Sequence, residues 1–279
     1  MKKHKIIFIL TTISLLMLLV ACNNINEAEQ SFTFEYSNMV DTETQIFVSE
    51  LLYRNGVNQI DINYFFELVN DFYNGYENIA DSGWITTTLK NFEYNDITAF
   101  AHWDSKKRNR IDINCRYAAY TLIKDTILSF DISAFSNIKD ENLISEHTLI
   151  NLADDEIKIY STLFSDIEVG NVDKNGFTEN IILHKHNNKI EFNNESKIKL
   201  ISLYTQHKST TAQVAHAAVI IEEDGYYFLL EKYDPLYPYQ ISKFISKENL
   251  LSYLAVRADG EIQHYAIFIN NDMAIIYTE

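Results

Sequence analysis

The fold of this chain is decided by the stretch VAHAAVIIEEDGYYFLLEKY, residues 214–233. Two apolar runs, 214–221 and 226–233, flank the tetrapeptide Glu222-Glu223-Asp224-Gly225. Acid-rich turns that end in glycine commonly connect antiparallel strands. The stretch therefore predicts a β-hairpin that forms the centre of an antiparallel sheet.

The length of the hairpin loop decides which residues face each other. A loop of four residues places Glu231 opposite His216, and a loop of only Asp224-Gly225 places it diagonal to His216 on the same face. A loop of odd length would place the two on opposite faces. A carboxylate after an apolar run is costly unless it is paired, so we predict a His216–Glu231 pair. The alternative is an ordinary ion pair of Glu231 with a nearby lysine, Lys232 or Lys243.

Outside the hairpin, the pattern changes from helical to extended along the chain. Apolar residues at helical spacing predict a helix over 58–73, two helices within 142–164 separated near 151–152, and a later helix over 248–257. Short β-type runs predict strands at 181–183, 189–192, 198–204, 266–269 and 274–277. This order predicts an α+β fold with a helical N-terminal half packed on a C-terminal antiparallel sheet.

The first 22 residues have the pattern of an export signal. A basic start, MKKHK, is followed by an apolar run over 6–20 that is too short for a comfortable membrane span. The tetrapeptide Leu19-Val20-Ala21-Cys22 resembles the lipobox of bacterial lipoproteins. We therefore expect a signal peptide over 1–21, a lipid on Cys22 that holds the protein on the outer face of the cell membrane, a polar tether over 22–35, and a single α+β domain over 36–279.

Charge and composition exclude several classes of function. The formal charge is −16, and loss of Lys2, Lys3 and Lys5 with the signal takes it to about −19. Such a surface repels nucleic acids and anionic wall polymers, so nucleic-acid binding is excluded. With only 7 glycines, a phosphate-binding glycine loop and long flexible linkers are not expected, and we predict no cofactor. The wealth of Ile, Asn, Lys and Tyr, together with the lipobox, favours a Gram-positive host.

Cys115 is the only other cysteine, so no disulfide forms within a lipidated chain. It lies in IDINCRYAAY, where the extended pattern gives way to helical spacing. Asn114 is a favoured N-cap residue, which places Cys115 at the first helical position. There the helix dipole and the neighbouring Arg116 favour the thiolate, the nucleophilic form. The alternative is a buried cysteine that only packs the helix against the sheet.

A cysteine nucleophile needs a base, and His216 is the best candidate among the 8 histidines. It begins the strongest apolar strand and has small neighbours, which leave room for another group. We predict Cys115 as nucleophile, His216 as general base and then acid, and Glu231 as the carboxylate that orients the imidazole. Asp234 is the fallback third residue, although three positions further along the strand it should face the other way.

The order of cysteine, histidine and acid, on a helix start and two adjacent strands, resembles papain-like hydrolases. It is most similar to the NlpC-type and cysteine/histidine-dependent amidohydrolase/peptidase (CHAP) domains, in which a glutamate on the strand after the histidine commonly serves as third residue. The resemblance implies a cysteine amidase or peptidase that acts on wall or other extracellular peptides. The chain departs from it in the residues around the cysteine, Asn114-Cys115-Arg116, and in the long segment before them.

Separated blocks over nearly the whole mature chain resemble the bacterial lipoprotein family catalogued as domain of unknown function 4300. These blocks are YSNMVD at 36–41, DINCR at 112–116, FLLEK at 228–232, PYQ at 238–240 and KF at 243–244. The resemblance implies a secreted or lipid-anchored protein and brings no activity with it. The alternative function is a non-catalytic surface lipoprotein that binds a ligand or a protein partner; a transport-type binding lipoprotein fits less well, because such proteins are usually longer and two-lobed.

One further pair of side chains has metal-binding chemistry. His184 and His186 would share one face of the strand expected around 181–183. No carboxylate or cysteine stands at a supporting spacing, so we predict a solvated strand face and no metal site.

Overall fold

The structure is a computed structural model that describes residues 32–75, 79–92, 112–131, 133, 135, 137–207, 209–256 and 262–278. The expected signal peptide and Cys22 lie outside these residues. The helices described are α2 (Thr42–Arg54), α3 (Gln59–Gly75), α5 (Cys115–Ile123), α6 (Glu141–Glu146), α7 (Asp154–Leu163), α8 (Lys174–Asn188) and α9 (Lys247–Val256), with short 3-10 turns η1 (Leu89–Asn91) and η2 (Lys124–Thr126).

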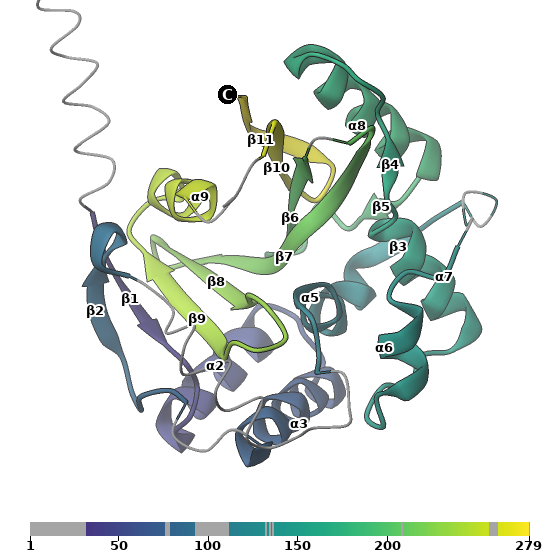
Figure 1. Cartoon of the computed structure of the whole chain (residues 1–279). Helices are drawn as coiled ribbons and strands as arrows, with labels where there is room; N and C mark the ends of the chain where they lie inside the picture. The colour runs from purple at the N-terminus through teal and green to yellow at the C-terminus, as the bar shows by residue number, and fades with distance from the viewer. Residues whose placement is uncertain are drawn as a thin grey trace, which may run out of the picture.

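A nine-stranded sheet organises the described part of the chain (Figure 1). Its order is β11 (Asp272–Thr278), β10 (His264–Ile269), β6 (Ile198–Gln206), β7 (Thr211–Glu223), β8 (Tyr226–Lys232), β9 (Tyr239–Phe244), β1 (Thr33–Ser37) and β2 (Ile85–Thr88), and β4 (Ile167–Glu168) pairs with the start of β7. All these pairings are antiparallel. Two short strands, β3 (Ile127–Ser129) and β5 (Glu191–Phe192), pair separately. The α+β class is confirmed.

The predicted hairpin is strands β7 and β8, and its loop has two residues. Glu223 pairs with Tyr226, so only Asp224 and Gly225 form the turn. Both have positive φ, 52° and 79°, which matches the two-residue turn that fits the twist of a hairpin. The loop is therefore of even length, in the shorter of the two forms expected.

The N-terminal half, which the sequence predicts to be helical, also contains strands of the main sheet. Strands β1 and β2 come from this half and extend the C-terminal sheet at its β9 edge. Residues 33–35, expected at the end of the tether, belong to β1. In β1, Phe34 is buried against Phe244 while its neighbours are more exposed. That stretch is a half-buried strand between β9 and β2 that is too short to give a clear alternation.

The predicted strand at 181–183 was wrong, because these residues lie in helix α8. Asp173 caps this helix by accepting a bond from the Gly176 N–H. Phe177 and Ile181, four positions apart, are buried on one face, whereas residues 182 and 183 are exposed. Three apolar residues cannot distinguish a strand from a helix, and here the helical spacing of the longer segment decided.

The other predicted elements are present: α3, α6, α7 and α9, and strands β6, β10 and β11 cover or overlap the expected ranges. Two apolar clusters lie on the two faces of the sheet. One includes residues of α2, α3, α5, α7 and α8, and the other lies under α9. Figure 1 shows α9 across the sheet from α2, α3 and α5. Helix α5 thus packs on one face at β7 and β8, and α9 packs on the other face at β8 and β9.

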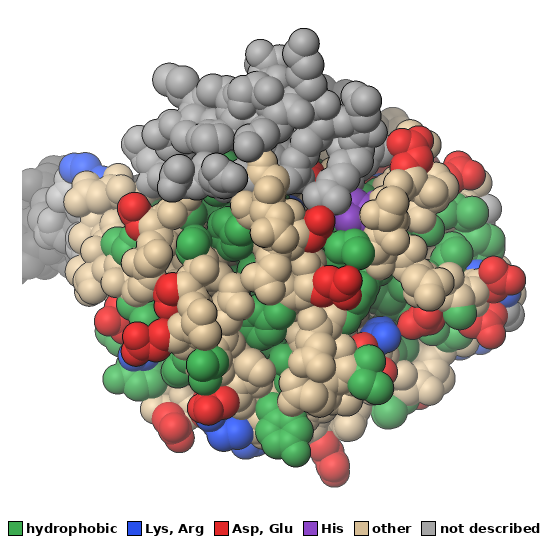
Figure 2. Space-filling model, turned by 90° about the horizontal axis from the view of Figure 1, so that it is seen from below, with side chains coloured by type: hydrophobic (Ala, Val, Ile, Leu, Met, Phe, Trp, Pro, Cys, Tyr) green, Lys and Arg blue, Asp and Glu red, His purple; other side chains and the backbone are tan. Residues whose placement is uncertain are grey.

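The surface agrees with the acidic composition. Figure 2 shows Asp and Glu side chains scattered over one face, with fewer Lys and Arg side chains among them. No helix in the described part of the chain is long and apolar enough to cross a membrane.

Candidate active site

Strand β7 is paired along most of one edge and along only part of the other. On the first edge it pairs with β6 over most of its length. On the second edge, its residues 211–212 pair with β4 and its residues 218–223 pair with β8. Within the described residues, positions 213–217 have no strand partner on this second edge. The start of helix α5 lies against this gap.

A β-bulge reshapes the strand at the gap. Leu203 of β6 pairs with His216, but the next residue, Tyr204, pairs with Val214, so Ala215 is an extra residue. A bulge disrupts the ladder locally and redirects side chains and carbonyls. Here it lets two successive carbonyl groups reach the start of α5.

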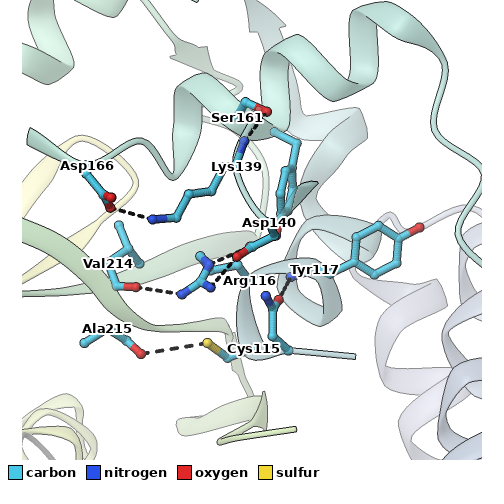
Figure 3. A network of polar contacts seen from close by, with 11 residues as sticks. Cys115, Arg116, Tyr117, Lys139, Asp140, Ser161, Asp166, Val214 and Ala215 are labelled. Atoms are coloured by element: carbon cyan, nitrogen blue, oxygen red, sulfur yellow. Dashed lines mark hydrogen bonds and ion pairs between the residues drawn. The ribbon is translucent and has the colours of Figure 1, made fainter. Parts of the chain in front are cut away.

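The start of α5 takes up these backbone groups. The Val214 carbonyl accepts a bond from Arg116 Nη1 at 3.0 Å, and the Ala215 carbonyl lies 3.9 Å from Cys115 Sγ. The backbone N–H of Ala217 also helps to lower the pKa of the thiol. The side chains at the helix start therefore bond to the edge of β7 at the positions that have no strand partner there (Figure 3).

Cys115 is the first residue of α5, as the sequence predicts. Asn114 has extended backbone angles and its side-chain oxygen accepts a bond from the Tyr117 N–H at 2.9 Å. This is the expected N-cap. The cap fixes where the helix begins and so places the thiol at the positive end of the helix dipole. Cys115 is 4% exposed.

Arg116 anchors the helix start through a charged network. Its guanidinium makes two bonds to Asp140, at 2.8 Å and 2.7 Å, and Tyr160 donates a third bond to the same carboxylate. Figure 3 shows Arg116 between Asp140 and the Val214 carbonyl. Burial would raise the pKa of Asp140, but the bonds from Arg116 and Tyr160 outweigh burial and lower it. The pair locks α5 to the residue that precedes α6.

The structure brings His216 and Glu231 together. Glu231 pairs with Ala218 across the hairpin, which is the diagonal register expected for a two-residue loop. His216 Nε2 and Glu231 Oε2 are 2.8 Å apart, and the two side chains are 3% and 0% exposed. The predicted pair is therefore confirmed in its geometry, and the alternative partners Lys232 and Lys243 bond elsewhere, to the Tyr237 carbonyl and to Glu35.

The imidazole and the thiol affect each other's ionisation. Burial raises the pKa of Cys115, but the nearby His216, the charge of Arg116 and the Ala217 N–H lower it overall. Burial lowers the pKa of His216, but Cys115 and Glu231 together raise it to about 9. Because Nε2 is bonded to Glu231, Nδ1 is the ring nitrogen that can exchange a proton with Cys115. Nδ1 has no fully formed hydrogen bond within the described residues, as is common in unliganded sites, where such bonds tighten only on substrate binding.

A cleft opens over the thiol. One rim is the start of α6, at Asp140–Leu143, and the other is the turn after β8, at Tyr233–Pro235; Cys115 and Ala215 lie at its base. The fallback residue Asp234 lies on this second rim, where its Oδ1 accepts a bond from the Leu236 N–H at 3.0 Å. Glu231, not Asp234, is the carboxylate bonded to His216.

Comparison with known proteins adds the family. The family model described as domain of unknown function (DUF4300) matches residues 35–275. The chain belongs to the DUF4300 family. The DUF4300 match spans Cys115, His216 and Glu231 as well as the elements that position them. No curated protein matches the chain, and no solved structure matches it.

The histidines of α8 are not paired on a strand face. His184 Nε2 bonds Ser165 Oγ and Asn188 Nδ2, each at 2.9 Å, and burial together with the charge of Lys185 lowers its pKa. His184 and His186 are two positions apart on a helix, so they do not share a face. Among the described residues, no three His, Cys, Asp or Glu side chains gather as a metal site.

Sequence reasoning missed several residues of this DUF4300 site. Asp140 lies outside any recognised motif, so nothing in the sequence indicated it; in the structure its backbone is left-handed, with φ 55°. Tyr253 and Gln240 both contact the Glu231 network and were not predicted. Only a polar residue at an otherwise apolar position, as at Gln240 in β9, could have pointed to them.

Proposed function

We propose that the protein is a lipid-anchored extracellular cysteine hydrolase of papain-like character, which cleaves amide bonds in wall or other extracellular peptides. The observation that carries this proposal is the buried 2.8 Å bond between His216 and Glu231, beside a thiol at a helix N-terminus. A protein that only packs or binds has no need of a buried imidazole and carboxylate next to a cysteine with a lowered pKa.

The topology supports the papain-like assignment. The nucleophile begins a helix that packs on an antiparallel sheet, and the base and the acid follow on adjacent strands of that sheet. The departure noted in the sequence, a long segment before the cysteine, is explained by added structure. That segment supplies β1 and β2 at the sheet edge and helices α2 and α3 on the α5 face.

In the first half of the reaction, the Cys115 thiolate attacks the carbonyl carbon of the amide. The N–H groups of the first turn of α5 have no intrahelical partner, so the Cys115 N–H is available to stabilise the oxyanion. His216 as imidazolium then donates its Nδ1 proton to the leaving amine. The carbon–nitrogen bond breaks, and a thioester to Cys115 remains.

In the second half, water hydrolyses the thioester. Neutral His216 accepts a proton from the water, whose oxygen attacks the acyl carbon. The carbon–sulfur bond breaks, the carboxylic acid leaves, and the thiolate–imidazolium pair is restored. Glu231 stabilises the imidazolium and fixes which ring nitrogen faces the sulfur, without itself taking up a proton.

The cleft also suggests a substrate class. Its lining includes four carboxylates and one arginine, and the arginine is already bonded to Asp140; the acids are Asp112, Asp140, Glu141 and Asp234. Such a lining repels phosphate-rich polymers and accepts neutral or cationic peptides. This supports a peptide substrate over an anionic wall polymer.

Thiol chemistry and product analysis test the hydrolase. If Cys115 is paired with His216, iodoacetamide should alkylate it fast near pH 6, well below the ~8.5 pKa of a free thiol. His216→Ala should slow this reaction sharply. Wild-type protein incubated with pooled peptides and peptidoglycan fragments should release new amine and carboxylate ends, and Cys115→Ala should release none.

The contrary result is equally clear. Slow alkylation at pH 6 that is indifferent to His216→Ala would reject the catalytic site. The protein would then be the non-catalytic surface lipoprotein that binds a ligand or partner. For these measurements a Cys22→Ala chain without the first 21 residues leaves Cys115 as the single thiol.

The lipid anchor is tested separately. We expect two or three acyl chains around Cys22, because a single chain binds a membrane only marginally. Cells fed a labelled fatty acid should label the full-length protein, and Cys22→Ala should abolish the label. Cys115→Ala is the matched control and should keep it. Label retained in Cys22→Ala would reject this residue as the attachment site.

A further inference from the structure

Glu231 is held at both of its oxygens. Oε2 accepts from His216 at 2.8 Å, and Oε1 accepts from the hydroxyl of Tyr253 at 2.5 Å. Tyr253 lies on α9, which packs on the sheet face opposite α5. The carboxylate next to the imidazole is thus bonded from two separate parts of the fold.

The direction of these bonds is fixed by chemistry. Gln240 Nε2 lies 2.9 Å from the Tyr253 hydroxyl and 2.7 Å from Ser242 Oγ. An amide nitrogen has two hydrogens to donate and accepts none. The Tyr253 oxygen therefore accepts from Gln240, and its own single proton is directed to Glu231.

The setting makes this donor chain important. Glu231, Gln240 and Ser242 are at most 4% exposed, and Tyr253 is fully buried. A buried carboxylate loses the solvation that stabilises its charge, and a donated hydrogen bond favours the charged form. The hydroxyl also fixes the plane of the carboxylate and thereby aims Oε2 at His216 Nε2.

We propose that Tyr253 and Gln240 are positioning residues for the Cys115 site, which keep Glu231 ionised and aimed at His216 and so raise the thiolate fraction of Cys115. This inference rests on the proposed hydrolase function. It makes helix α9 part of the machinery, although α9 contributes no residue to the cleft lining. Neither residue touches the thiol, so each acts only through the carboxylate.

The pH dependence of Cys115 alkylation tests the inference. A hydrogen bond to a charged group changes the ionisation it affects by about ten-fold or more, and part of this reaches the thiol through His216. In Tyr253→Phe we expect the apparent thiol pKa to rise by ~0.5–1 unit and the alkylation rate at pH 6 to fall ~3- to 10-fold. Gln240→Met should give a smaller shift in the same direction, because the Tyr253 proton is then no longer directed toward Glu231.

The matched control is Tyr120→Phe. Tyr120 is a buried tyrosine on α5 whose hydroxyl bonds the Glu156 carbonyl, away from the carboxylate. This variant should keep the wild-type thiol pKa. Circular dichroism and a melting curve verify the fold of each variant, and if Tyr253→Phe does not fold, Gln240→Met provides the same test.

Each outcome is decisive. A fast wild-type thiol that is unchanged in Tyr253→Phe, or in Gln240→Met if that variant is used, overturns the positioning role and leaves the hydrolase intact. An equal shift in Tyr120→Phe overturns it too, because the effect is then a general loosening of the core. A wild-type thiol that is slow at pH 6 overturns the hydrolase, and the positioning role with it.

Discussion

Replacing Glu231 by glutamine should lower the pKa of His216. The substitution keeps the shape of the side chain and an acceptor oxygen but removes its charge. At the 2.8 Å separation of Nε2 and Oε2, the attraction of two unit charges is roughly 6 kcal/mol at an effective dielectric constant of 20. The pKa of His216 rises from 6.5 to about 9, which corresponds to about 3.4 kcal/mol. Burial favours the neutral imidazole and offsets the remainder of the Coulomb energy.

Cys115 contributes to this rise as well as Glu231. Glu231→Gln should therefore lower the pKa of His216 by ~1–2 units, and not by the whole Coulomb term. The sign follows from the charge, because a nearby anion stabilises imidazolium and its loss favours the neutral ring. At pH 8 the wild-type ring is protonated and the variant ring is mostly neutral. A less basic imidazole also takes the thiol proton less readily, so the thiolate–imidazolium form of the pair is less populated. Alkylation of Cys115 at pH 6 should therefore slow by ~10-fold, less than in His216→Ala.

Nitrogen-15 NMR of labelled histidine measures this pKa directly. The His216 signals are assigned by their absence in His216→Gln. Asp234→Asn is the matched control, since Asp234 lies on the cleft rim and bonds the Leu236 N–H, and it should leave the titration within ~0.3 unit of wild type. A wild-type His216 that titrates near 6.5, or an unchanged titration in Glu231→Gln, would show that Glu231 does not raise the pKa of His216.

Three further predictions concern stability, each measured by urea unfolding. Lys185→Met should raise the free energy of unfolding at pH 7 by ~2–3 kcal/mol, because burial lowers the pKa of this lysine to about 8, whereas the unfolded chain keeps the proton to about 10.5. Between these two pKa values, the free energy of unfolding of the wild type should rise with pH, and its difference from that of the variant should shrink. A difference that is unchanged at pH 10 would contradict this. Arg116→Lys should lower the free energy of unfolding by ~2–3 kcal/mol, since lysine cannot make both bonds to the partly buried Asp140. Lys158→Arg, on an exposed ion pair, is the control and should leave the free energy of unfolding almost unchanged. Gly225→Ala should cost ~1 kcal/mol because the turn requires φ of 79°, and a neutral result would show that the hairpin tolerates another turn type.

The local features of the site could be predicted from the order of the amino acids. The N-cap residue Asn114 fixed where α5 begins, and so placed Cys115 at a helix start. The acid–glycine turn predicted a hairpin, and with a loop of even length, strand alternation places His216 and Glu231 on one face. These features depend on neighbours in the chain or on one hairpin, where the period of the backbone leaves few alternatives. The assignment of Glu231 over Asp234 follows from the same alternation.

The surroundings of the hairpin could not be predicted in this way. On its β8 edge, β7 has no strand partner over 213–217 among the described residues. A bulge at Ala215 turns two carbonyls toward α5, and Arg116 meets Asp140. All of these features depend on contacts between distant segments. The same holds for β1 and β2 at the sheet edge, and for Tyr253, which reaches Glu231 from the far face. Sheet edges, bulges and buried polar bonds depend on which surfaces of the folded chain come into contact. A short apolar run such as 181–183 adopts the secondary structure that best buries the longer segment to which it belongs.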